Sequence, residues 1–263
     1  MTVLLRAEKL EVTYHRVVTA VQGVSLEVAA GSIVALIGNN GAGKTTTLRA
    51  LSGFLGVDDA RVSDGSIVYA GRRIDNQPPH VIARLGVALV PERSKVFEGL
   101  TVEENLQAAV TRSGASVPTF DSLFALFPAL LKVRRRDAGY LSGGERQMLA
   151  IASALRCAPQ LLLVDELSLG LAPRIVQELA GRLRDVRRTL GTTLLVVEQN
   201  AQIALELADY AYVMENGRIV LDGPTDRLRG HADVREFYLG MGGEQRRSYR
   251  DVKQYRRSRR WYG

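Results

Sequence analysis

Eight residues with the sequence GNNGAGKT, from Gly38 to Thr45, fit the pattern G-x-x-x-x-G-K-[ST] without a mismatch. In this pattern glycines let backbone N–H groups converge on phosphate oxygens, and the dipole of the following helix adds positive potential. Lys44 reaches the β- and γ-phosphates, and the Thr45 hydroxyl is a ligand for Mg²⁺. The alternative is a glycine-rich turn without a ligand. We expect a nucleotide site made by Gly38, Asn39, Asn40, Gly41, Ala42, Gly43, Lys44, Thr45 and Thr46.

Two adjacent carboxylates end the apolar run LLLVDE, residues 161–166. A buried strand that delivers acids to its carboxyl end can place them beside a bound nucleotide. Asp165 would hold Mg²⁺, directly or through water, and Glu166 would orient or deprotonate the attacking water. The alternative is a strand that ends in an ordinary charged turn. Together with the phosphate-binding loop, the pair indicates hydrolysis of a nucleotide.

A second apolar run, LLVVEQN at residues 194–200, also ends on polar side chains, Glu198 and Gln199. Glu198 is therefore a second candidate for the catalytic carboxylate. Gln199 can donate a hydrogen bond but cannot titrate, so it cannot carry a proton to or from the substrate.

Hydrophobic periodicity and turn residues predict the elements that position these side chains. We expect strands at LEVTY, VSLEVAA, SIVALIG, SIVYAG, GVALVP, LLLVD and TTLLVVE, and a closing hairpin at YAYVMENGRIVLDG with a type I′ turn at Asn216-Gly217. We expect helices at GKTTTLRALSG, TVEENLQAAV, FDSLFALFPALLKV, GGERQMLAIASALR, PRIVQELAGRLRDVRRTL and NAQIALELA.

Strands on both sides of a helical block predict an α/β protein with a P-loop NTPase core. The core would hold a mostly parallel sheet and an antiparallel N-terminal β-subdomain, with ligands at the carboxyl ends of the parallel strands. The expected division is one domain over 1–240, with core segments 1–95 and 157–240, a helical subdomain over about 96–156, and a basic tail over 241–263.

The composition, 46% hydrophobic and 24% charged over 263 residues, is that of a soluble globular protein. We expect no membrane span and no secretory signal peptide. The single cysteine, Cys157, excludes an internal disulfide and is expected to be inert. Residues 246–260 carry a net charge of +7, and subtracting this from the total of +7 leaves the remainder with no net charge. The tail is therefore expected to be solvated or to contact a partner, a membrane surface is the next alternative, and nucleic acid is the least favoured.

The segment LSGGE, residues 141–145, lies between the two nucleotide motifs and opens the helix GGERQMLAIASAL. These three motifs in this order resemble the ATP-binding subunits of ABC transporters, over about residues 4–240. The resemblance implies ATP and Mg²⁺ as ligands and a head-to-tail dimer. In that dimer, the loop of one subunit contacts the γ-phosphate held by the other. The residues it assigns to this contact are Ser142, Gly143, Gly144 and Glu145.

The same resemblance assigns roles to three further residues. Tyr14 matches the aromatic residue that stacks on adenine. Glu92 stands where the family usually has a glutamine that contacts Mg²⁺ and relays to the membrane subunit. Gln199 occupies the position of a histidine that contacts the γ-phosphate, so Glu198 is a neighbour of the site and Glu166 is the better candidate for the general base.

Several departures from the family pattern occur together: VPE for VPQ, DELSLGLAP without the usual aspartate, and VEQN. With LTVEENL and VMENGRIV they resemble one ATPase of the branched-chain amino acid importers, although Leu167 stands where that group commonly has proline. The resemblance implies a heterodimer with a second ATPase at the cytoplasmic face of the membrane, two permease subunits and, indirectly, a solute-binding protein. Urea or amide import, lipopolysaccharide-type export, a non-transport ABC ATPase and a regulatory subunit that barely hydrolyses ATP remain alternatives.

Overall fold

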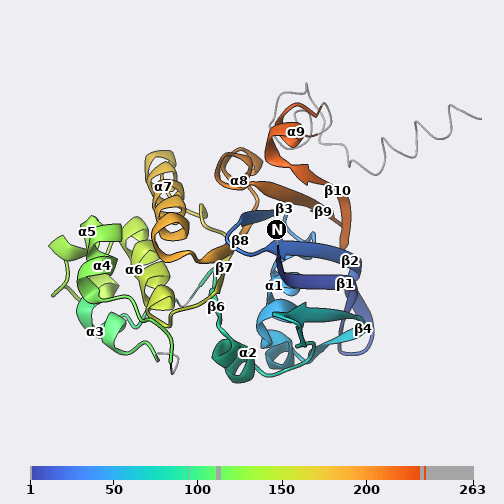
Figure 1. The fold of residues 1–263 in the computed structure, drawn as a ribbon, viewed down its shortest axis with the longest axis horizontal. Helices are drawn as coiled ribbons and strands as arrows, with labels where there is room; N and C mark the ends of the chain where they lie inside the picture. Colours follow the sequence, from blue (N-terminus) through green and yellow to red (C-terminus); the bar gives the residue numbers. More distant parts are fainter. Residues whose placement is uncertain (1, 94, 111–113, 232–233, 235–263) are drawn as a thin grey trace, which may run out of the picture.

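A computed structural model describes residues 2–93, 95–110, 114–231 and 234, which form two β-sheets and two groups of helices (Figure 1). The six-stranded sheet has the order β10-β9-β3-β8-β7-β6, and the four-stranded sheet has the order β2-β1-β4-β5. Residues 241–263, the basic tail of the sequence analysis, lie outside the described residues.

The six-stranded sheet is parallel except at one edge, where β9 and β10 form an antiparallel hairpin. Its central strands are buried on both faces, which explains why they read as continuous apolar runs. The hairpin turn has positive φ at both Asn216 and Gly217, as a type I′ turn requires. The strands are β3 (Ile33–Gly38), β6 (Val87–Val90), β7 (Leu161–Asp165), β8 (Thr193–Glu198), β9 (Tyr210–Glu215) and β10 (Arg218–Pro224).

The four-stranded sheet is antiparallel throughout and packs against the first sheet through a shared apolar core. Alternate residues of β3 point to opposite faces, so Val34 and Leu36 join this core whereas Ile33 and Ile37 join the core under the helices. The strands are β1 (Val3–Tyr14), β2 (Val18–Ala29), β4 (Ala60–Tyr69) and β5 (Arg72–Arg73). The mostly parallel sheet with an antiparallel N-terminal sheet confirms the expected α/β fold class.

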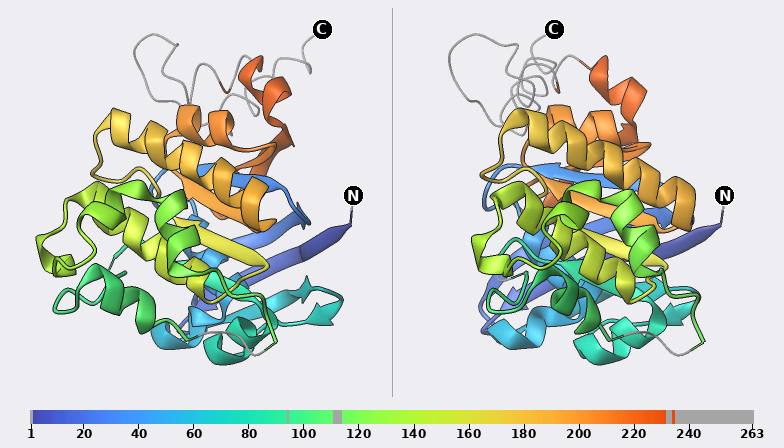
Figure 2. Two further views of the ribbon diagram at one scale, coloured as in Figure 1. Left: turned by 60° about the vertical axis from the view of Figure 1, so that its left-hand side comes forward. Right: turned by 90° about the vertical axis from the view of Figure 1, so that its left-hand side faces the viewer.

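Helices α3 to α6 lie together on one side of the molecule, opposite the antiparallel sheet (Figures 1 and 2). Helix α1 instead contacts strands of both sheets. The helices are α1 (Lys44–Ser52), α2 (Pro79–Leu85), α3 (Val102–Gln107), α4 (Phe120–Leu126), α5 (Pro128–Lys132), α6 (Gly143–Arg156), α7 (Pro173–Leu190), α8 (Ala201–Leu207) and α9 (Thr225–Arg229), with 3₁₀ turns at Phe54–Asp58 and Ala138–Tyr140.

The helical pattern over residues 120–133 is broken into two short helices. Phe127, between them, has φ −125° and ψ 72°, and Pro128 opens α5. Since a residue that precedes proline is disfavoured in the helical region, the break follows directly from the sequence F-P. Within the described part of the chain, no helix has the length and apolar character needed to cross a membrane.

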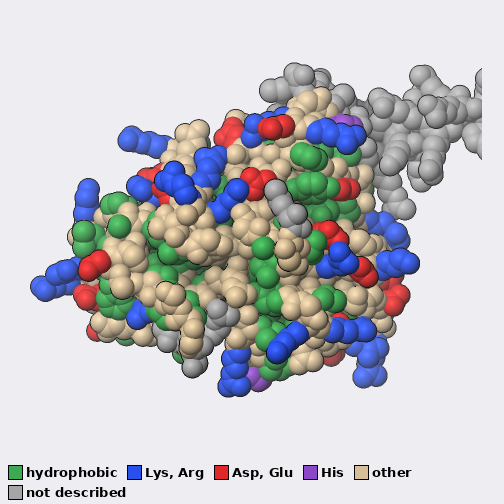
Figure 3. Space-filling view, viewed as in Figure 1, with side chains coloured by type: hydrophobic (Ala, Val, Ile, Leu, Met, Phe, Trp, Pro, Cys, Tyr) green, Lys and Arg blue, Asp and Glu red, His purple; other side chains and the backbone are tan. Residues whose placement is uncertain are grey.

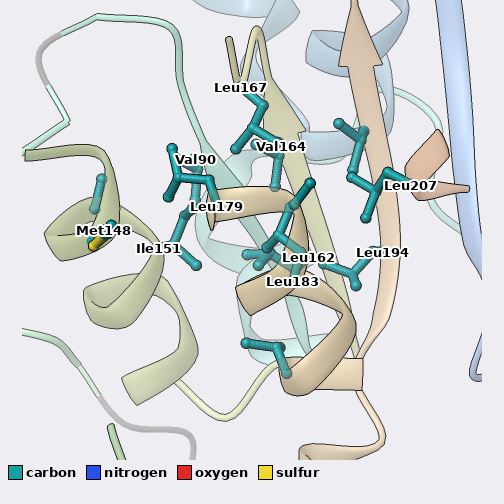
Figure 4. Packing of buried hydrophobic residues seen from close by; sticks show 14 of the residues in the cluster. Val90, Met148, Ile151, Leu162, Val164, Leu167, Leu179, Leu183, Leu194 and Leu207 are labelled. Carbon is teal, nitrogen blue, oxygen red and sulfur yellow. The ribbon is translucent and has the colours of Figure 1, made fainter. Parts of the chain in front are cut away.

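Helices α6 and α7 pack on strands β6 to β8 through aliphatic side chains (Figure 4). Leu167, just after β7, belongs to this cluster together with Val164 and is fully buried. On the surface shown in Figure 3, Lys and Arg side chains are interspersed with Asp and Glu and do not form one continuous patch.

Candidate active site

The phosphate-binding loop connects β3 to α1 and is backed by the end of β9. Gly43, just before α1, has φ 102°, a left-handed conformation that favours glycine. A Cβ atom on Gly38 would lie 2.4 Å from the carbonyl oxygen of Met214 in β9. The loop therefore needs these two glycines because of the strand behind it as well as any phosphate in front of it.

Lys44 is almost fully buried, and its ammonium group is held close to the loop. It donates hydrogen bonds to the carbonyl oxygens of Gly38 at 2.8 Å and Asn39 at 3.3 Å. Its Nζ atom also lies 3.2 Å from Oε1 of Glu166. The structure thus brings the lysine of the first motif against the second acid of the other motif, although 122 positions separate them in the numbering.

Thr45, in the first turn of α1, lies against Asp165, the last residue of β7. The Thr45 hydroxyl donates to Oδ1 of Asp165 at 3.4 Å. Burial raises the pKa of the Asp165 carboxyl to about 6 against the lowering effect of this hydrogen bond, and the nearby carboxylates of Glu166 and Glu92 raise it further. A cation placed among these carboxylates would stabilise their ionised forms.

The donor set at this position fits Mg²⁺. Among the described residues, no group of three or more His, Cys, Asp or Glu side chains is arranged to hold a metal by itself. Mg²⁺ is usually bound by one or two carboxylates, water and the phosphates of a nucleotide, so a complete protein cage is not required. A hydroxyl and a buried carboxylate beside a phosphate-binding loop meet that requirement.

Glu166 is anchored to the end of β8. It has a positive φ of 50°, its amide donates to the carbonyl oxygen of Val197 at 3.0 Å, and its Oε2 accepts the Gln199 amide at 3.3 Å. The Gln199 side chain is exposed. The neighbouring strand therefore fixes the position of Glu166.

Glu198 is completely buried, and Ser168 donates to both of its carboxylate oxygens. Burial raises the pKa of Glu198, in opposition to the hydrogen bond from the Ser168 hydroxyl, and the charge of Glu166 adds to the increase. The structure places Glu198 beside the site, with its oxygens occupied by protein donors.

A cavity of about 630 Å³ opens in front of the phosphate-binding loop. Its lining brings together the loop, Glu92 and Glu166. The Tyr14 hydroxyl lies 3.1 Å from the Thr46 hydroxyl, although Tyr14 is not part of the lining. The further lining residues are Val18, Thr19, Ala20, Gln22, Asn216 and Gly217.

Sequence reasoning did not assign the β9–β10 turn to this site. Gly217 donates its amide to the carbonyl oxygen of Ala42 at 2.9 Å, and its own carbonyl accepts the Gln22 amide at 2.7 Å. The Asn216-Gly217 pair was visible in the sequence as a turn. Its contact with the loop depends on the sheet order, in which β9 is the neighbour of β3.

The LSGGE segment starts α6 with a reciprocal cap. The Glu145 amide donates to Oγ of Ser142 at 3.3 Å, and Oε2 of Glu145 accepts the Ser142 amide at 2.8 Å and the hydroxyl at 2.7 Å. None of these residues lines the cavity at the phosphate-binding loop. Within one chain, the segment and the loop are therefore not brought together.

Comparisons with known proteins agree with these motifs. Residues 21–168 match the family described as "ABC transporter". The chain is 46% identical to the high-affinity branched-chain amino acid transport ATP-binding protein BraG of Pseudomonas aeruginosa. The 230 aligned residues cover 87% of this chain and 96% of BraG. It is 34% identical to the lipopolysaccharide export system ATP-binding protein LptB of Acidithiobacillus ferridurans, over 91% of this chain and 98% of that one.

Solved structures give the same result for the fold. The ADP conformation of an ATP-binding cassette of an ABC transporter superposes with a TM-score of 0.76 at 26% identity, over 91% of this chain and all of that one. Family, relatives and fold agree with the phosphate-binding loop and paired acids described above. The chain belongs to the ABC transporter family and is one of its ATP-binding, ATP-hydrolysing subunits.

Proposed function

We propose that this chain hydrolyses Mg·ATP, with Glu166 as general base, to power import of branched-chain or other hydrophobic amino acids. The observation that carries the catalytic part is the convergence of Lys44, Asp165 and Glu166 on the phosphate-binding loop. The amino acid substrate is supported by the relatives, since BraG and a probable LivF of Archaeoglobus fulgidus, 37% identical, are both described as branched-chain amino acid transport ATP-binding proteins.

In this mechanism the loop amides and Lys44 hold the phosphates. Thr45, Asp165 and Glu92 would hold Mg²⁺, and the bound ion would supply positive charge beside the phosphate oxygens. The Lys44 Nζ atom lies 3.2 Å from Oε1 of Glu166, and bound phosphates would compete with this carboxylate for the ammonium group. Glu166 is then able to accept a proton from the attacking water.

Completion of the site requires a second ATPase subunit. The segment Ser142–Glu145 lies away from the chain's own cavity, which supports a head-to-tail arrangement in which it contacts ATP held by the partner. We assign Tyr14 to the adenine and Gln199 to the γ-phosphate. The partner is a non-identical ATPase, so the motor is a heterodimer.

The permease is proposed to dock in a second cavity, of about 910 Å³, between the core and α6. This cavity lies where the core segments 1–95 and 157–240 meet the helical subdomain at about 96–156, so closure of the dimer would move its walls. Its lining is largely apolar and includes Phe54, His80, Ala83, Leu89, Val110 and Ala154. The chain would therefore sit at the cytoplasmic face of the membrane, with a solute-binding protein acting on the far side.

A second candidate is lipopolysaccharide-type export, which is favoured by the 34% identity to LptB. The higher identity to BraG favours amino acid import. The experiment is to reconstitute the chain with its second ATPase and permease in liposomes and to measure ATP turnover and uptake of radiolabelled leucine. We expect turnover that rises with the partner, vanishes in Glu166→Gln and drives uptake. Turnover without uptake of any hydrophobic amino acid would contradict the substrate, and negligible turnover in the full assembly would identify a regulatory subunit.

A further inference from the structure

Glu198 is a buried residue whose two carboxylate oxygens both accept hydrogen bonds. The side chain has no solvent exposure. Oε1 accepts the Ser168 amide and Oε2 accepts the Ser168 hydroxyl, each at 2.8 Å. A buried carboxylate is costly unless charge-assisted hydrogen bonds compensate it, and this pair supplies two of them.

The residue it holds, Ser168, ends the turn that carries Glu166. The other two residues of this turn, Glu166 and Leu167, are held by separate contacts. Glu166 donates its amide to Val197, and Leu167 is buried in the apolar cluster (Figure 4). Ser168 is half-buried, and the next residues, Leu169 and Gly170, are exposed. The bonds from Ser168 to Glu198 thus fix the chain just before these two exposed residues, after which Leu171 packs, half-buried, against the apolar cluster.

We propose that Glu198 is a positioning residue for hydrolysis: its carboxylate clamps Ser168 and thereby fixes the turn that aims Glu166 at the phosphate-binding loop. It also sets the path of the two exposed residues that follow, Leu169 and Gly170. Glu198 itself exchanges no proton with the substrate. This inference rests on the proposed role of Glu166 as the base.

The two donors on Ser168 explain which substitutions keep the clamp. A glutamine at position 198 can accept from the Ser168 amide through its oxygen and donate to the Ser168 hydroxyl through its nitrogen, because a hydroxyl both donates and accepts. An alanine at 198 removes both bonds and leaves two donors of Ser168 without their acceptor. Ser168→Ala removes one bond and keeps the amide.

The test measures steady-state ATP turnover of the full chain mixed with its second ATPase subunit, with the partner alone as background, together with Mg·ATP affinity. We expect Glu198→Ala to lower kcat by about 10- to 100-fold, because a misplacement of about 1 Å can cost that much. KM should change by less than about threefold, because the residues that hold the phosphates are untouched. Glu198→Gln should stay within about tenfold of the unaltered chain, and Ser168→Ala should fall between the two.

Val196→Ala is the matched control. Val196 lies two residues earlier on the same face of β8 and is equally buried, so its truncation weakens the strand without touching the clamp. An equal loss of kcat in Val196→Ala and Glu198→Ala would overturn the inference in favour of general destabilisation. A loss in Glu198→Gln as complete as in Glu166→Gln would make Glu198 a proton acceptor instead.

Two further outcomes separate this inference from the proposed function. If Glu166→Gln is inactive while Glu198→Ala turns over normally, only the positioning role fails. If Glu166→Gln hydrolyses ATP normally, the assignment of the base fails first. A crystal structure of Glu198→Ala provides a readout that does not depend on turnover. We expect the turn at Glu166–Ser168 to be displaced there, and an unchanged turn would overturn the inference.

Discussion

Replacement of Asp165 by asparagine should stabilise the nucleotide-free protein while it abolishes Mg²⁺-dependent turnover. Burial raises the pKa of Asp165 from 3.8 to about 6, with further contributions from Glu166 and Glu92 against the opposing hydrogen bond from Thr45. Since one pKa unit corresponds to about 1.4 kcal/mol, the ionised carboxylate costs the folded state up to about 3 kcal/mol. Asparagine has no charge to bury, and its oxygen can still accept the Thr45 hydroxyl.

The sign of the pH dependence follows from the two pKa values. Below about pH 4 the carboxyl is protonated in both the folded and the unfolded chain, so the substitution changes little. Between about pH 4 and pH 6 the unfolded chain ionises while the folded chain keeps its proton, and the stability of the unaltered protein falls as pH rises. The advantage of Asp165→Asn should therefore grow through this window and level off near pH 7.

Urea denaturation of both proteins without Mg²⁺ or nucleotide, in steps from pH 4 to pH 8, measures this difference directly. We expect the free energies of unfolding to coincide at the acidic end and to differ by up to about 3 kcal/mol at pH 7. A variant that is less stable than the unaltered protein at pH 7 would refute the reasoning. It would show that the hydrogen bond of the Asp165 carboxylate stabilises the folded state by more than burial of its charge destabilises it.

Three other substitutions test separate parts of the structure. Glu166→Gln should retain Mg·ATP binding and lose turnover, since it keeps the shape of the base and removes its proton-accepting function; normal turnover would contradict the assignment. Gly38→Ala should weaken ATP binding at least about tenfold in a titration, because its Cβ would lie 2.4 Å from the Met214 carbonyl oxygen; unchanged affinity would mean that β9 yields. Thr101→Ala removes the reciprocal cap of α3 and should lower the free energy of unfolding by about 1 kcal/mol with turnover unchanged, as measured by urea denaturation.

Features determined by local sequence were predictable. Helix α7 begins at Pro173 and ends at Leu190, as its pattern and the following glycine indicate, and the turn at Asn216-Gly217 has the expected backbone. The break at Phe127 was also encoded locally, in the proline after it, but the apolar periodicity continues across it and concealed it.

Contacts between distant segments were not predictable in the same way. The clamp between Ser168 and Glu198 joins residues whose strands are neighbours only because of the sheet order, and neither residue type identifies the other. The same holds for the turn at Gly217, which supports the phosphate-binding loop through Ala42. Sequence motifs were thus enough to identify the reactive side chains. The residues that hold these side chains in place could be identified only from the order of the strands in the sheet.

The sheet order also has a consequence for synthesis of the chain. Strand β3 carries the phosphate-binding loop, yet both of its partners, β8 and β9, begin only at Thr193 and Tyr210. A nascent chain that has emerged only as far as α7 therefore has an apolar strand with both edges unpaired, the condition that promotes aggregation. Such long-range pairing slows folding, so nucleotide affinity should arise late in translation, and the ribosome-bound chain should depend on chaperones until the last third has emerged.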